Sequence, residues 1–133
     1  MPDQPAIQPK WMTWAGYALT ALVALFMAMD FTMKFMQLPV VVTTTESLGW
    51  NASKVLLLGA ILLPCTLLYV IPQTSVLGAI LITGYLGGAA ATHIRIDSPL
   101  FSHILFGVYL GVMTWGGLWL REPRLRALLP LKR

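Results

Sequence analysis

Long runs of apolar residues without a charge dominate this chain. The first run extends from Trp11 to Met29 without a charged side chain, and about 20 apolar residues in a helix suffice to cross a bilayer. The chain is 57 % hydrophobic and 11 % charged, with a mean hydropathy of +0.74. A small domain in water buries only part of its surface. This composition therefore excludes a water-soluble enzyme, a nucleic-acid-binding protein and a disordered chain, and it predicts a membrane protein.

The apolar runs predict four membrane-spanning helices, with approximate bounds 11–38, 54–72, 74–93 and 99–120. Membrane strands are excluded because they alternate apolar and polar residues. We expect Pro39 to end the first helix, Pro72 to separate the second from the third, and Asp97 or Ser98 to cap the fourth. Short connections make neighbouring helices antiparallel. The expected fold is all-α, an integral membrane up-down four-helix bundle.

Positive charge is distributed unevenly between the two sides of this bundle. Six of the nine Lys and Arg residues lie near the two chain ends, and Lys34, Lys54 and Arg95 lie on the opposite side. Because Lys and Arg favour the cytoplasmic side, both termini are expected there. Residues 1–10 are expected to be disordered. Residues 121–133 form a basic cytoplasmic tail, expected to lie on the anionic inner leaflet, with a specific lipid-headgroup or partner site as the alternative.

Two Gly-x-x-x-Gly spacings occur in the third and fourth expected helices, at Gly84 and Gly88 and at Gly107 and Gly111. This spacing places two glycines on one helix face and allows another helix to approach closely. We expect the third and fourth helices to pack together there. A homodimer interface is the alternative.

The ionisable residues within the expected bundle gather at its non-cytoplasmic end. Asp30 and Lys34 are one helical turn apart and can form an ion pair. An acid within a membrane helix is a candidate functional residue. Together these positions predict a polar cavity near the outer surface. Its candidate ligand-binding residues are Asp30, Lys34, His93, Arg95 and His103.

Each of these residues also has a purely structural interpretation. Asp30 and Lys34 would then form an ion pair that closes the first helix, and the two histidines would be hydrogen-bonded core residues. Arg95 would pair with Asp97 or meet an anionic ligand. The segment from Thr43 to Trp50 is amphipathic and is expected to cover the cavity. No element has metal-ligand spacing, so no metal site is predicted.

The chain resembles the DoxX-like family of small bacterial membrane proteins from about Trp14 to Pro130. The similarity is carried by the runs Asp30–Lys34, Ser47–Trp50, Thr83–Arg95 and Pro99–His103. The resemblance implies a four-helix protein of the bacterial inner membrane. It also implies a link to redox processes, since the family takes its name from a subunit of a thiosulfate:quinone oxidoreductase. It identifies no catalytic residue.

The leading hypothesis is an accessory subunit, without catalytic activity of its own, that binds a lipidic small molecule such as a quinone. Electrons would come from a partner in a redox complex, because the sequence contains no evident cofactor motif. Whether the chain is an enzyme subunit is left open. The alternatives are a small dimeric transporter and a scaffold that positions partner helices. A proton-coupled transporter needs an acid near the middle of the first span, whereas Asp30 is near its end.

Overall fold

The computed structural model describes residues 8–132, and within that range every regular element is a helix. The sequence predicts disorder for residues 1–10; residues 1–7 lie outside the described residues, and Lys10 already belongs to the first helix. In chain order the elements are α1 (Lys10–Phe35), α2 (Pro39–Ser47), α3 (Lys54–Val70), the 3-10 turn η1 (Pro72–Thr74), α4 (Ser75–Arg95), the π-helical turn η2 (Leu100–Ile104), α5 (Phe106–Arg121) and α6 (Pro123–Leu128).

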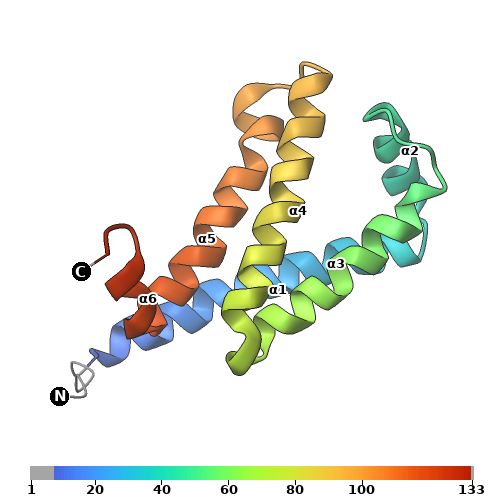
Figure 1. Ribbon diagram of the computed structural model, residues 1–133. Helices are drawn as coiled ribbons and strands as arrows, with labels where there is room; N and C mark the ends of the chain where they lie inside the picture. The colour runs from blue at the N-terminus through green and yellow to red at the C-terminus, as the bar shows by residue number, and fades with distance from the viewer. Residues whose placement is uncertain (1–7, 133) are drawn as a thin grey trace.

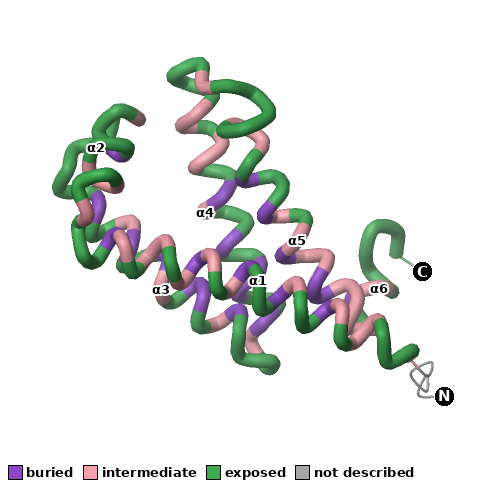
Figure 2. The backbone as a smooth tube through the Cα atoms, turned by 180° about the vertical axis from the view of Figure 1, so that it is seen from behind, coloured by how far each residue is buried: buried purple, intermediate pink, exposed green. Residues whose placement is uncertain are grey.

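Four long helices run alternately up and down (Figure 1). Helix α1 packs against α3 and α5, and α4 packs against the same two helices. The pair α1–α3 and the pair α4–α5 diverge towards the end that carries α2 and η2 (Figure 1). The buried residues follow the lines of contact between the four helices (Figure 2). The predicted all-α membrane fold is confirmed, as a bundle that is splayed at one end.

The outward faces of the long helices are apolar. Exposed residues include Leu25 of α1, Ile61 of α3, Ile80 of α4 and Val112 of α5, as expected for faces that contact lipid. Among residues 8–132, three segments are long and apolar enough to cross a membrane: Lys10–Phe35, Pro72–Arg95 and Leu100–Arg121. Helix α3 has 17 residues and a length of about 25 Å. That is slightly less than the ~30 Å of a hydrocarbon core, so a crossing by α3 stays a prediction.

The expected end of the first helix, near the splayed end, is wrong in detail. Helix α1 ends at Phe35, and Gln37 has a φ of 51° that reverses the chain. Pro39 does not end α1. It occupies the first turn of α2, where its missing N–H costs no hydrogen bond.

The predicted cap of the fourth helix is also wrong. Asp97 has a φ of 55° and lies in the turn after α4. The next segment starts as a π-helical turn preceded by Pro99, with no side-chain cap. The side chain of Ser98 instead lies 3.0 Å from His93 Nδ1. Ser98 therefore ties the turn back to α4.

The two Gly-x-x-x-Gly motifs behave differently. A Cβ atom at Gly107 would lie 3.1 Å from the carbonyl oxygen of Leu86, and one at Gly111 would lie 4.0 Å from Cδ1 of Leu86. No such neighbour lies within 4 Å of a Cβ at Gly84 or Gly88 among the described residues. The expected packing of α4 on α5 through Gly84 and Gly88 is therefore wrong. Leu86 faces α5 instead. Gly84 and Gly88 are each two residues from Leu86, and residues two apart lie on nearly opposite sides of a helix, so both glycines face away from α5.

Candidate functional site

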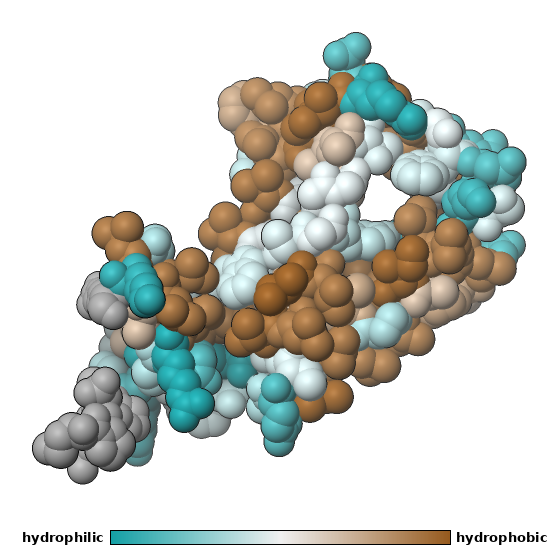
Figure 3. Space-filling view, in the orientation of Figure 1, coloured by the Kyte–Doolittle hydropathy of each residue, from teal (hydrophilic) through white to brown (hydrophobic). Residues whose placement is uncertain are grey.

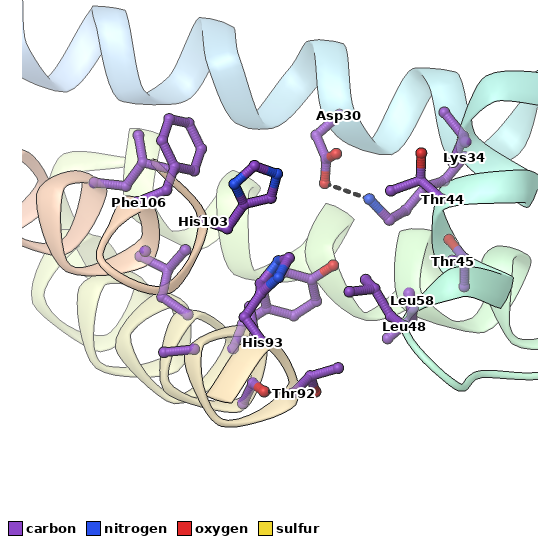
Figure 4. Close-up of a pocket in the computed structure, with 18 of the residues that line it drawn as sticks. Asp30, Lys34, Thr44, Thr45, Leu48, Leu58, Thr92, His93, His103 and Phe106 are labelled. Carbon is purple, nitrogen blue, oxygen red and sulfur yellow. Dashed lines mark hydrogen bonds and ion pairs between the residues drawn. The ribbon is translucent and has the colours of Figure 1, made fainter. Parts of the chain in front are cut away.

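A cavity of about 520 Å³ occupies the splayed end of the bundle. It lies between α1 and α2 on one side and α4, η2 and the start of α5 on the other (Figure 4). The space-filling view shows an opening at this end of the molecule (Figure 3). Its volume is within the range of pockets that bind small molecules, roughly 300–1,000 Å³. Most of the lining is apolar, and a few polar side chains converge on it.

The ion pair between Asp30 and Lys34 is present on the α1 wall. Lys34 Nζ donates a hydrogen bond of 2.7 Å to Asp30 Oδ2, and both residues line the cavity. The Lys34 side chain is only 11 % exposed, whereas that of Asp30 is 32 % exposed. A Cβ at Gly59 of α3 would lie 3.1 Å from Lys34 Cβ. Helix α3 thus covers the Lys34 stem, and the charged ends of the pair face the cavity (Figure 4).

The two histidines lie together on the opposite wall. His93 belongs to the last turn of α4 and His103 to η2, and their ring centres are 5.6 Å apart. Each ring has one nitrogen beside a serine hydroxyl. His93 Nδ1 is 3.0 Å from Ser98 Oγ, and His103 Nδ1 is 2.7 Å from Ser102 Oγ. These contacts orient the rings and leave both Nε2 atoms available to a ligand.

Arg95 lies outside this group. Its guanidinium donates a 2.7 Å hydrogen bond to the carbonyl oxygen of Leu48, so it joins the end of α4 to the loop between α2 and α3. Gly49 has a φ of 90°, and a Cβ there would clash with the Arg95 guanidinium. The contact therefore requires glycine at this position. Arg95 therefore links α4 to the loop after α2 at the edge of the cavity. It forms no ion pair with Asp97.

Helix α2 forms one side of the cavity. Val40, Val41, Thr44 and Thr45 all line it. The amphipathic segment predicted to cover the cavity is therefore in place, although the helix starts earlier, at Pro39. Arg95 joins α4 to the loop that follows this helix.

Aromatic residues on the cavity walls were mostly missed from the sequence. Phe26 and Phe106 line the cavity from α1 and α5, with ring centres 5.3 Å apart, and Trp50 lines it from the loop after α2. Tyr85 of α4 also lines the cavity. Helical spacing could have found both, because Phe26 lies four residues before Asp30 and Phe106 lies three residues after His103, each on the same helix face as a predicted cavity residue.

The polar groups of the cavity suit a neutral or weakly polar oxygen ligand. Lys34 and the two imidazoles can donate hydrogen bonds, and Asp30 can accept one. Within residues 8–132, no three His, Cys, Asp or Glu side chains come together to hold a metal ion. Apolar walls with a few converging polar groups are typical of sites for amphipathic small molecules.

The model of the DoxX-like family matches residues 18–117. The chain belongs to the DoxX-like family. Among curated proteins and among solved structures, none matches it. Every residue that lines the cavity of this DoxX-like protein lies inside the matched segment. Helix α6 and the last residues of α5 lie beyond it.

Proposed function

We propose that this DoxX-like protein is an accessory membrane subunit that binds a lipidic small molecule, with a quinone as the leading candidate, in the splayed-end cavity. The observation that carries the proposal is the pair of histidines opposite the Asp30–Lys34 pair, on walls that are mostly apolar. A ligand with a polar ring and an apolar chain fits both features. The redox link implied by the family resemblance favours a quinone over other lipids.

The residues on the walls have distinct parts in this proposal. His93 or His103 donates a hydrogen bond from Nε2 to a carbonyl oxygen of the ligand, while its Nδ1 atom stays with a serine hydroxyl. Lys34 is held by Asp30 and can donate a further hydrogen bond from its Nζ atom. Phe26 and Phe106 contact the ligand ring or chain. Electrons would come from a partner subunit.

The π-helical turn supports a functional assignment. It carries His103 and precedes α5. Short π-helical segments occur frequently at functional sites, because they turn a side chain out of regular helical register. Here that turn places His103 on the cavity wall beside His93.

The orientation in the membrane belongs to the same proposal. Both described ends of the chain lie at the end of the bundle opposite the cavity (Figure 1), and most Lys and Arg residues are near those ends. By the preference of Lys and Arg for the cytoplasmic side, the termini are cytoplasmic and the cavity opens near the outer face of a bacterial inner membrane.

Mass spectrometry of an organic extract tests the proposed ligand. The protein is purified gently from membranes, and we expect one quinone or other lipid to be recovered in a ratio near one per chain. Asp30→Asn and His103→Ala should each reduce its recovery by about tenfold, because the first removes the carboxylate that holds Lys34 and the second removes one of the two imidazole donors, each an effect on the order of 1–2 kcal/mol.

Two control variants keep this test specific. Asp97→Asn makes the same chemical change in an exposed turn, and Phe101→Ala truncates a residue of η2 that is 73 % exposed. Neither residue lines the cavity, so both variants should retain the ligand. An extract with only bulk phospholipid, identical for all variants, would contradict the proposal and favour a scaffold.

A further inference from the structure

A second polar feature lies at the opposite end of the bundle, at the end of α5. The Arg121 side chain is half-buried, and its Nε atom is buried without a hydrogen-bond partner among residues 8–132. Its terminal NH2 group makes one long hydrogen bond, 3.4 Å, to Ser75 Oγ. The guanidinium carbon lies 4.8 Å from the centre of the Tyr17 ring. No carboxylate of the described residues forms an ion pair with it.

Close packing fixes the Cβ end of the Arg121 side chain. A Cβ at Gly16 of α1 would lie 2.6 Å from the carbonyl oxygen of Gly117 and 2.9 Å from Arg121 Cβ. Helices α1 and α5 are therefore in direct contact beside Arg121. A cationic group held in place before binding loses little conformational entropy when a ligand arrives.

The other two arginines nearby have different environments. Arg126 donates hydrogen bonds to the carbonyl oxygens of Trp119 and Leu120, at 2.7 and 3.0 Å, and to Gln8 Oε1 at 2.8 Å. It satisfies free carbonyls at the end of α5. Arg124 is exposed, and its side chain has no hydrogen-bond partner among the described residues. Of these three arginines, all within residues 8–132, only Arg121 combines partial burial with a guanidinium nitrogen that lacks a partner.

The surroundings of Arg121 match the interfacial region of a bilayer. Tyr17 is 47 % exposed, and Trp14 and Trp11, on the preceding turns of α1, are 72 % and 66 % exposed. Trp and Tyr concentrate at the level of the lipid headgroups. Hydrophilic residues also gather at this end of the molecule (Figure 3). An anion that reaches Arg121 here is most simply one attached to a lipid.

We propose that Arg121, with Tyr17 against its guanidinium and Ser75 beside it, binds the phosphate of an anionic phospholipid. An arginine guanidinium matches the geometry of phosphate with two parallel hydrogen bonds. Arg124 and the other exposed basic residues add a general attraction to the anionic leaflet, while Arg121 supplies the specific contact. This site is separate from the splayed-end cavity and does not depend on its ligand.

Native mass spectrometry of the full-length protein tests this site. The protein is titrated with phosphatidylglycerol or phosphatidylcholine, and wild type is compared with Arg121→Gln and with the control Arg124→Gln. We expect wild type and Arg124→Gln to retain one phosphatidylglycerol in preference to phosphatidylcholine. Arg121→Gln should weaken that binding by about tenfold, the effect of losing a charge-assisted pair.

Further measurements separate the other outcomes. Arg121→Lys keeps the positive charge but not the planar guanidinium, so we expect it to bind phosphatidylglycerol more weakly than wild type and more tightly than Arg121→Gln. Unchanged far-UV circular dichroism of both variants shows that folding is intact. Equal losses in Arg121→Gln and Arg124→Gln, or no preference for the anionic lipid, would overturn the proposal. Displacement of the lipid by an excess of inorganic phosphate would show that the site recognises free phosphate and would also overturn it.

Discussion

Replacing Gly78 by alanine should destabilise the protein by about 3 kcal/mol, near the upper end of the usual cost of overpacking. Gly78 lies in the first turns of α4, directly against the end of α3. An added Cβ would overlap the backbone nitrogen and Cα of Tyr69 and would lie 2.7 Å from the carbonyl carbon of Leu68. These are backbone atoms, so no side-chain rotation can relieve the overlap.

The strain would spread because Tyr69 is central to the core. Its side chain is fully buried, and its hydroxyl donates a 2.8 Å hydrogen bond to the carbonyl oxygen of Thr114 and lies 3.3 Å from Thr20 Oγ1. Any movement of the end of α3 away from α4 would therefore disturb contacts with α1 and α5 as well. This is why we expect a larger effect at Gly78 than at other glycines of α4.

Gly87→Ala is the matched control for this prediction. It makes the same substitution in the same helix, where no neighbouring atom lies within 4 Å of the added Cβ. We expect it to leave the unfolding free energy unchanged or to raise it by about 1 kcal/mol, the difference in helix propensity. Unfolding in mixed micelles, followed by far-UV circular dichroism, measures both variants. Equal stability of the two would contradict the packing of α3 on α4 described above.

Lys34→Met should destabilise the protein by about 2 kcal/mol. It removes the cation that pairs with Asp30 but keeps a side chain of similar length. Breaking a fully buried pair costs roughly 3–5 kcal/mol. We expect less here because Asp30 is 32 % exposed and is partly screened by solvent.

A double-mutant cycle tests the cause of this loss. In the Asp30→Asn, Lys34→Met variant no unpaired charge is left, so most of the lost stability should return. Lys54→Met is the control, because Lys54 is exposed at the start of α3, and it should change stability by no more than about 0.5 kcal/mol. If the double variant is as unstable as Lys34→Met, the ion pair is not the source of the effect.

Much of the fold follows from the sequence, for physical reasons. Continuous apolar runs identify helices in a bilayer, because a helix forms all of its backbone hydrogen bonds within one segment. The i, i+4 spacing of Asp30 and Lys34 fixes them on one helix face, and the ion pair is present. His93 and His103 also reach the same cavity as this pair, since both lie at the same end of the bundle.

Other features depend on how the helices are rotated and crossed, which a local pattern does not specify. The Gly84–Gly88 face could equally meet a helix, lipid or a cavity, and it lines the cavity. The contact of Arg95 with Leu48 joins residues far apart in the sequence. Gly78 belongs to no recognised motif, yet it has the closest backbone approach of the glycines in α4.

In the proposed function, the splayed-end cavity holds a lipidic molecule between the histidines and the Asp30–Lys34 pair. An experimental structure of the protein in lipid nanodiscs, with no ligand added, tests it most directly. We expect elongated density in the cavity, with a polar end within about 3.2 Å of an Nε2 atom of His93 or His103. A cavity closed by movement of α4 against α2, or filled by a helix of a second copy, would contradict it.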